Sequence, residues 1–218
     1  MSGRVIIVVL GKQGAGKGTQ CKRLAESLSI PHVSTGDILR AAVREKTPLG
    51  LEVESVLAAG NLVNDELVGR LVRERFTEAD AQRGALLDGY PRNQAQAALL
   101  EEILGDDGIK LVLSLDVDSV LVAERLSARR VCQECGAIYR DTDIEAISGT
   151  CEKCGGDVVQ RDDDQPAAIL QRLATYERDT APLLDFYEAR DLLVHVNGNQ
   201  APDEVTADIM TIVADRGL

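Results

Sequence analysis

The glycine-rich segment 11–19, GKQGAGKGT, follows directly on the unbroken apolar run Val5–Leu10. A short run rich in branched apolar residues predicts a strand that is buried on both faces. The spacing of Cys21 and Leu24 predicts a helix after the glycines. Glycines in such a turn let consecutive backbone N–H groups face a polyphosphate, at the positive end of the helix dipole. The segment therefore predicts a phosphate-binding loop in which Lys17 supplies a mobile positive charge.

The residue after Lys17 is Gly18, where loops of this kind usually carry a Ser or Thr that ligates magnesium. Thr19 comes one place later. We therefore expect magnesium to be held mainly by nucleotide phosphates and water molecules.

The composition of the chain favours a small-molecule substrate. Its 218 residues are 44% hydrophobic, which is enough to bury a sizeable core. The formal net charge of -12 argues against a nucleic-acid partner or an anionic membrane surface, because either needs a basic face. No run of about 18 apolar residues occurs. The first predicted strand begins too early to leave room for a signal peptide, so we expect a cytoplasmic protein.

Short apolar runs separated by segments of helical spacing predict an α/β fold. Parallel strands covered by crossover helices on both faces read as continuous apolar runs, so the sheet should be parallel. The predicted strands are Val5–Leu10, Ala85–Leu87, Leu111–Leu115 and Leu192–Val196. Predicted helices begin near Asp118, Asp164 and Ala201, and the second runs to about Arg190 with a kink at Pro182.

Two stretches do not fit this alternation. Residues 34–63 have helical spacing but lie between the first two predicted strands, in a connection too long for a simple crossover. Residues 131–160 contain too few apolar side chains to offset ~1 to 2 kcal/mol of ordering entropy per residue. Another source of stability is therefore expected in the second stretch.

That source is predicted to be a metal ion. Cys132 and Cys135 form one Cys-x-x-Cys pair, and Cys151 and Cys154 form a second pair after fifteen intervening residues. This spacing predicts a closed tetrahedral zinc site, which can supply about 10 to 16 kcal/mol. Because four protein ligands leave no position open for substrate, the role should be structural. Two disulfides or an iron centre are the alternatives.

Several arginines stand close to predicted turns. An enzyme that moves a phosphoryl group between two nucleotides must neutralise many phosphate charges. Arginine suits that task because its planar guanidinium binds phosphate bidentately and stays charged. The candidates are Arg40, Arg92, Arg125, Arg129, Arg161 and Arg172.

Seven segments occur in one order along the chain: GKQGAGKGTQ, STGDILRAAV, GNLVNDELV, LLDGYPRNQAQ, ERLSARRVC, QRDDDQ and TAPLLDFY. Together they resemble the adenylate kinase family, specifically its long-lid, zinc-bearing form. The resemblance implies a P-loop core with a doubly wound parallel sheet and two inserted mobile subdomains. The core would comprise residues 1–33, 64–130 and 165–218. An AMP-binding insertion would span 34–63, and a lid with the four-cysteine zinc site would span 131–164.

The resemblance also implies a binding site for ATP with Mg²⁺. Asp88 would bind the magnesium through water. The ATP phosphates would lie on Gly14, Ala15, Gly16, Lys17, Gly18 and Thr19, and the ATP base near Arg125, Arg129, Ile138, Tyr139 and Gln200.

The acceptor site and the catalytic groups follow from the same resemblance. Gln96 would read the adenine edge of AMP, and Arg92 would bind its phosphate. The AMP site would comprise Thr35, Arg40, Asn61, Leu62, Val63, Gly89, Tyr90, Pro91, Arg92, Gln96, Arg161 and Arg172. The catalytic set would be Lys17, Arg92, Arg129, Arg161 and Arg172, with Asp163 and Asp164 fastening the closed lid.

The implied activity is reversible phosphoryl transfer from ATP to AMP by a monomeric enzyme, giving two ADP. Gln13 and Arg140 depart from the family pattern, and Arg140 leaves the choice between ATP and GTP open. A kinase that uses GTP, or one specific for UMP or CMP, is therefore an alternative. A nucleotide-gated zinc-ribbon interaction protein is another, although residues 131–160 carry six acidic and two basic side chains.

Overall fold

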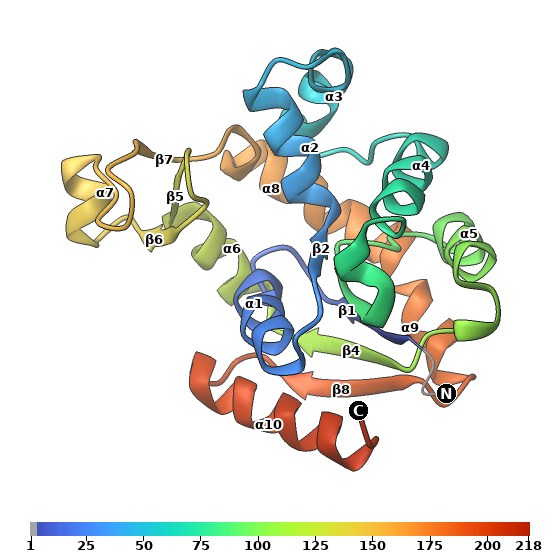
Figure 1. Cartoon of the computed structure of the whole chain (residues 1–218). Helices are drawn as coiled ribbons and strands as arrows, with labels where there is room; N and C mark the ends of the chain where they lie inside the picture. The colour runs from blue at the N-terminus through green and yellow to red at the C-terminus, as the bar shows by residue number, and fades with distance from the viewer. Residues whose placement is uncertain (1–3) are drawn as a thin grey trace.

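A parallel β-sheet forms the centre of the computed structural model, which describes residues 4–218. Its strands are β1 (Val5–Leu10), β2 (His32–Ser34), β3 (Gly84–Asp88), β4 (Leu111–Asp116) and β8 (Leu193–Asn197), in the order β2-β3-β1-β4-β8. Neighbouring strands run parallel. Their carboxyl ends therefore meet at one edge of the sheet, where open α/β folds bind ligands (Figure 1).

Helices connect the strands and cover the sheet. They are α1 (Lys17–Leu28), α2 (Thr35–Arg44), α3 (Pro48–Ala58), α4 (Asp65–Arg75), α5 (Gln94–Leu104), α6 (Ser119–Ala128), α7 (Ile144–Ser148), α8 (Pro166–Thr175), α9 (Pro182–Glu188) and α10 (Pro202–Asp215). Short 3₁₀ turns occupy Ala79–Arg83, Gly105–Asp107 and Asp162–Asp164, and a π-helix occupies Tyr176–Thr180.

The strands alternate between two hydrophobic clusters, one on each face of the sheet. On β1, Ile6 and Val8 join one cluster, and Ile7 and Val9 join the other. Helices α4, α5 and α9 contribute to the first cluster, and α1, α6 and α10 to the second. Burial on both faces explains why the strands read as continuous apolar runs. The predicted doubly wound α/β fold is confirmed.

One strand escaped the sequence analysis. β2 has three residues, of which only Val33 belongs to a hydrophobic cluster, so it gives no apolar run. His32–Ser34 pairs with β3 at the edge of the sheet. Residues 34–63 therefore lie between β2 and β3, which corrects the prediction that they lie between the first two strands.

The long helix predicted from Asp164 to about Arg190, with a kink at Pro182, is present as three successive helical segments that are interrupted just before Pro182. α8 ends at Thr175, and α9 begins at Pro182, with the π-helix Tyr176–Thr180 between them. Proline lacks an N–H and is tolerated in the first turn of a helix, which is its position in α9.

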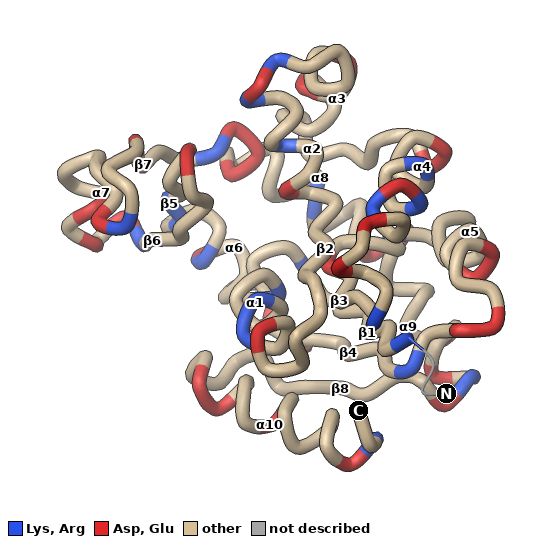
Figure 2. Tube along the Cα trace, in the orientation of Figure 1, with Lys and Arg blue, Asp and Glu red and all other residues tan. Residues whose placement is uncertain are grey.

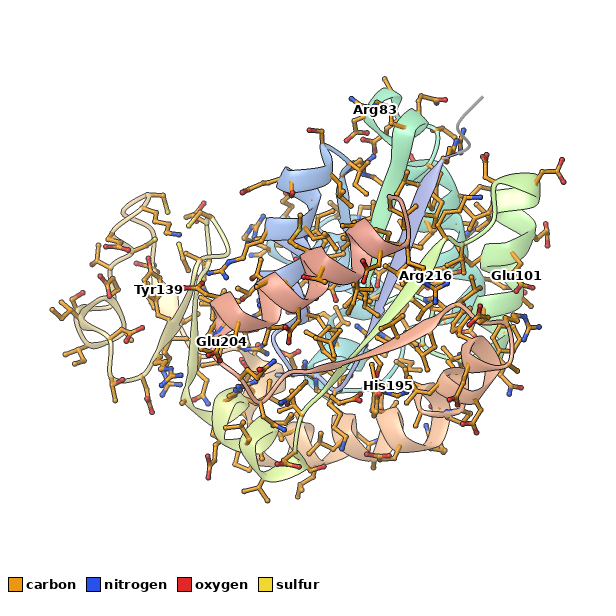
Figure 3. All side chains as sticks on the ribbon, turned by 90° about the horizontal axis from the view of Figure 1, so that it is seen from below. Arg83, Glu101, Tyr139, His195, Glu204 and Arg216 are labelled. Carbon is orange, nitrogen blue, oxygen red and sulfur yellow. The ribbon has the colours of Figure 1, made fainter. Side chains whose placement is uncertain are left out.

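Successive side chains of a strand point to opposite faces of the sheet. His195 therefore lies on the face of β8 opposite to Val196, the face that α9 covers; Figure 3 labels it.

A second, antiparallel sheet lies apart from the main one (Figure 1). It consists of β5 (Arg129–Cys132), β6 (Ile138–Arg140) and β7 (Val158–Val159), in the order β6-β5-β7, with α7 beside it. Its small core includes Cys132, Tyr139 and Cys151. Among residues 4–218, no helix is both long enough and apolar enough to cross a membrane.

Candidate active site

The glycine-rich loop joins the end of β1 to the start of α1. Gly11, Gly14 and Gly16 all have positive φ values, which bend the chain around the amine of Lys17. A side chain on Gly14 would come within 2.9 Å of Leu126, because the loop packs tightly on α6. The Lys17 Nζ donates hydrogen bonds to the carbonyl oxygens of Gly11 and Lys12, at 2.7 and 2.9 Å. The predicted loop therefore has the geometry of a phosphate cradle.

Lys17 lies close to the hydrogen-bonded side chains of His32, at the start of β2, and Asp88, at the end of β3. Burial lowers the pKa of the Lys17 amine to about 8, although the charge of Asp88 opposes this shift. Burial disfavours the charged form of Asp88, but the hydrogen bond from His32 and the charge of Lys17 hold its pKa below the usual value. The His32 Nε2 lies 3.3 Å from Asp88 Oδ2. The sequence analysis assigned His32 no role, since this contact depends on β2 pairing with β3.

Asp88 is placed to meet a magnesium ion on a bound nucleotide. Its carboxylate is charged, and a side chain on Gly18 would lie 3.7 Å from Asp88 Oδ2. The missing side chain at Gly18 leaves room beside the carboxylate. Charged oxygen ligands with space for water suit magnesium. The residues present therefore fit the predicted water-mediated contact.

Four arginines converge on the cavity beyond the loop. Arg40 comes from α2, Arg92 follows β3, Arg161 follows β7 and Arg172 lies in α8, and all four border one cavity with Lys17. Figure 2 shows basic residues on α2, on α8 and on the segment between β7 and α8, which belongs to residues 131–164, called the lid below. Burial and the charges of Arg172 and Arg40 lower the pKa of Arg92 to about 10. Burial and the charges of Arg40 and Arg129 lower that of Arg161 to about 9.

Burial is the larger cause of these pKa shifts, and the charges of neighbouring arginines add to it. Acidic side chains relieve part of the repulsion, since Asp37 accepts from Arg40 at 2.6 Å and Asp163 lies 3.1 Å from Arg172. Among residues 4–218, Arg92 and Arg161 form no ion pair. A polyanion in the cavity would neutralise both and raise their pKa values again.

Arg92 is held by three hydrogen bonds that leave its terminal guanidinium nitrogens available. Its Nε donates to the Gly89 carbonyl at 2.8 Å, and its backbone N–H donates to Gln96 Oε1 at 2.8 Å. The Thr180 hydroxyl donates to the Arg92 carbonyl at 2.7 Å. Thr180 lies in the segment TAPLLDFY, but its sequence position does not reveal a contact with a residue 88 positions away.

A second cavity lies beside Arg92. It is bordered by Thr35, Arg40, Asn61, Leu62, Val63, Gly89, Arg92, Gln96 and Arg172, which the sequence analysis assigned to one site. Gln96 is buried, and so is Tyr90. Pro91, which follows a cis peptide bond, borders the larger cavity.

Asp164 is the most deeply buried carboxylate of the site and is fully enclosed. Arg129 donates to it through two nitrogens, Nε at 2.8 Å and Nη2 at 2.6 Å. Arg172 Nη1 donates to it at 3.1 Å and to the Asp163 carbonyl at 2.9 Å. In this conformation, Arg129 therefore binds Asp164 at the base of the lid, rather than facing the cavity with Arg161.

The four cysteines of the two Cys-x-x-Cys pairs come together in the lid. Their sulfur atoms all lie within 4.8 Å of one another. Sγ of Cys132 is 3.4 Å from that of Cys154, and Sγ of Cys135 is 3.6 Å from that of Cys151. Thiolates on one tetrahedral zinc ion would be roughly 3.8 Å apart, given Zn–S distances of about 2.3 Å. The residues present therefore fit a zinc ion.

Of the residues expected near the ATP base, Ile138 borders the large cavity, whereas the side chains of Tyr139, Arg125 and Gln200 contact other protein groups. Ile138 is half exposed and borders the large cavity. Tyr139 is buried inside the lid, where Figure 3 labels it, and its hydroxyl lies 3.1 Å from Cys151 Sγ. Its side chain therefore packs against the cysteine cluster. Arg125 donates to the Gly198 carbonyl at 3.3 Å, and the Gln200 side chain bonds Asp208 at 2.7 Å.

Comparison with known proteins agrees with this geometry. A family model described as Adenylate kinase matches residues 9–192. The chain belongs to the adenylate kinase family. It is 44% identical to an adenylate kinase of Thermoanaerobacter sp. (strain X514) over 214 residues, covering 97% of this chain and 99% of that one. It is 46% identical to an adenylate kinase of Finegoldia magna over 208 residues, covering 94% and 97%. An adenylate kinase of Geobacillus sp. (strain WCH70) is 45% identical over 210 residues, covering 95% and 97%.

Membership of the adenylate kinase family establishes the reaction. The chain is a nucleotide-binding phosphotransferase that moves a phosphoryl group from magnesium-bound ATP to AMP. The alternatives considered from the sequence are not favoured: a kinase that uses GTP, a kinase specific for UMP or CMP, and a nucleotide-gated zinc-ribbon interaction protein.

Removing the lid metal should unfold the lid before the core. We expect Cys151→Ser, or treatment with a strong zinc chelator, to remove about one equivalent of metal and to abolish amide protection in residues 131–160. Hydrogen exchange and elemental analysis measure both effects. Cys21→Ala is the control, because Cys21 is buried between α1 and the sheet. Retention of lid protection after metal loss would contradict the prediction.

Asp164→Ala should strongly destabilise the protein, because it leaves Arg172 and Arg129 partly buried without their shared partner. We expect the free energy of unfolding to fall by about 3 to 5 kcal/mol, measured by urea denaturation. Asp162→Ala is the matched control, since Asp162 is exposed in the same short turn. Equal effects of the two substitutions would show that the buried ion pairs contribute little.

ATP binding should be accompanied by proton uptake at alkaline pH. With a pKa of about 8, Lys17 is mostly neutral at about pH 9 in the free enzyme. Phosphate charges favour the protonated amine, so ATP binding should make Lys17 take up close to one proton at about pH 9 and almost none near pH 6.5. Calorimetry in buffers of different ionisation enthalpy measures the total uptake. Lys17→Arg should remove the Lys17 share and leave only the smaller share of Arg161, whose pKa of about 9 also rises when phosphate binds.

Proposed function

We propose that ATP and AMP bind end to end in the two adjoining cavities, with the four converging arginines around the transferred phosphoryl group. The single observation that carries this arrangement is the convergence of Arg40, Arg92, Arg161 and Arg172 with Lys17 on one cavity. Several positive charges gathered in a partly buried place favour a polyanionic ligand, which neutralises them. Two facing nucleotides supply several phosphate charges at one place.

The donor site would be the glycine-rich loop. Gly14, Ala15, Gly16, Lys17, Gly18 and Thr19 would hold the ATP phosphates, and the ATP base would rest against Ile138, Arg125 and the backbone near Tyr139 and Gln200. The exposure of Ile138 toward the cavity supports this placement. Asp88 would orient water molecules of the magnesium ion, whose charge helps to neutralise the phosphates when it is bound.

The acceptor site would be the smaller cavity beside Arg92. Arg92 and Arg40 would bind the AMP phosphate, and Gln96 would contact its adenine. The convergence of Thr35, Asn61, Leu62, Val63 and Gly89 on that cavity supports the assignment.

Catalysis would rest on position and charge rather than on a covalent intermediate. The phosphate of AMP is already an anionic nucleophile and needs no strong base. Alignment of two bound reactants can lower a barrier by ~7 to 11 kcal/mol. Arg161, Arg172 and Lys17 would stabilise the charge that spreads over the transferred group.

The lid would close over the nucleotides and exclude water. Arg129 would then exchange its bidentate contact with Asp164 for a phosphate, while Asp163 and Asp164 fasten the closed state. The position of Arg129 and Asp164 at the base of the lid supports this exchange of contacts. The cysteine cluster would hold structural zinc, because its four ligands leave no position open.

The wider properties of the enzyme follow from its charge and family. We propose a monomeric cytoplasmic enzyme whose partners are small nucleotides, with no nucleic-acid or membrane partner. The formal net charge of -12 supports the last point.

A coupled assay with separate nucleotides tests the proposed site. In the presence of ATP and Mg²⁺, we expect ADP to form when AMP is supplied, and almost none with UMP, CMP or no acceptor. Replacement of ATP by GTP should lower kcat/KM and test the donor preference. Arg92→Ala should raise KM for AMP by more than tenfold, on the order of the 1.5 to 3 kcal/mol of a charged hydrogen bond, and change KM for ATP little. Equal increases for the two nucleotides would contradict the assignment of the two cavities.

A further inference from the structure

Asp65, in the first turn of α4, forms hydrogen bonds with Gln96, which borders the acceptor cavity, and with Asn93. Its two carboxylate oxygens accept from Asn93 Nδ2 at 3.0 and 3.1 Å. Oδ1 also accepts from Gln96 Nε2 at 2.7 Å. Asn93 in turn accepts from the Gln96 backbone N–H at 2.8 Å, which caps α5. Asp65 therefore joins the start of α4 to the start of α5.

The opposite end of the Gln96 amide is also fixed. Gln96 Oε1 accepts from the Arg92 backbone N–H at 2.8 Å. A carboxylate can only accept a hydrogen bond, and a backbone N–H can only donate one. Rotating the amide by half a turn would place its NH₂ group against the Arg92 N–H and its oxygen against the Asp65 carboxylate. The orientation of Gln96 is therefore determined by its two neighbours.

This arrangement leaves Gln96 with a defined pattern for a ligand. An amide NH₂ has two hydrogens and an amide oxygen has two lone pairs. Within residues 4–218, Asp65 and Arg92 occupy one of each, so one N–H and one lone pair remain. Gln96 is 2% exposed and borders the acceptor cavity together with Val63 and Val68.

The remaining pattern matches one kind of purine. Adenine presents an acceptor at N1 and a donor at its 6-amino group, which pair with an amide N–H and an amide oxygen. Hypoxanthine and guanine carry a donor at N1 and an acceptor at O6, so they require the amide to be reversed. A buried donor left facing a donor costs about 1 to 3 kcal/mol, which corresponds to roughly five- to 150-fold in affinity.

We propose that Asp65 is a positioning residue that makes the acceptor site select adenine over 6-oxopurines, acting through the orientation of Gln96. The inference rests on the proposed contact between Gln96 and the base of AMP. Asp65 itself does not border the cavity and touches no substrate in this arrangement.

Asp65→Asn tests the proposal, because an amide can both donate and accept and so permits either orientation of Gln96. We expect the ratio of kcat/KM for AMP to kcat/KM for IMP to fall about tenfold, through a higher KM for AMP and a lower KM for IMP, with kcat for AMP changed less than twofold. Glu66→Gln is the matched control. It removes the same charge from the same helical turn, and Glu66 is exposed.

The outcomes separate this proposal from the proposed function. If Asp65→Asn lowers activity with AMP and IMP equally, or leaves their ratio unchanged, the orienting role is wrong. Gln96→Ala is the second arm. A collapsed ratio in that variant shows that Gln96 reads the base even when Asp65 fails its test. An unchanged ratio in Gln96→Ala removes the proposed base contact, and the inference falls with it.

A measurement on the unsubstituted enzyme applies even if Asp65→Asn does not fold. In ¹⁵N-labelled enzyme without nucleotide, the two Gln96 side-chain amide protons, assigned by their loss in Gln96→Ala, should differ in exchange rate. The proton on the Asp65 carboxylate should exchange more slowly than the other. Rapid and equal exchange of both protons would overturn the proposal.

Discussion

Repulsion among positive charges is the constraint on which the functional half of this structure depends. Burial and the charges of neighbouring arginines lower the pKa values of Arg92 and Arg161 to about 10 and 9. Such a group of cations adds nothing to the stability of the free protein. Buried Asp164 offsets part of the repulsion by binding Arg129 and Arg172. Phosphate groups that enter the cavity would neutralise the remaining repulsion among the arginines. The site therefore favours polyanionic ligands over neutral ones.

The parallel sheet places these cations at one edge. Strand β1 leads into the loop with Lys17. The neighbouring strand β3 ends at Asp88 and is followed by Arg92. Two hydrophobic clusters hold the strands from both faces, so the strand ends are the positions at which polar groups can gather. Arg161 comes from the lid, which we propose closes over the bound nucleotides, so its position suits binding followed by closure.

Much of this arrangement could be predicted from the sequence. The phosphate loop and the four cysteines are local patterns in which spacing alone indicates chemistry, and the continuous apolar runs indicate buried strands. The sequence analysis missed features whose sequence pattern is very short and contacts that join residues far apart in the chain. β2 has three residues and no apolar run. Nothing in the sequence indicates that the Tyr139 hydroxyl lies against Cys151, a contact that only the folded structure reveals. The contacts of Asp65 and Thr180 likewise join residues far apart in sequence.

The π-helix Tyr176–Thr180 contacts both halves of the site at once. At one position, Glu177 forms an ion pair with Lys12 of the phosphate loop at 3.1 Å. Three residues later, Thr180 bonds the Arg92 carbonyl at 2.7 Å. One helical turn thus contacts both the proposed donor site and the proposed acceptor site, and so fixes the distance between them. Inserting or deleting a residue there would alter the separation of the two nucleotides while leaving each individual binding surface intact.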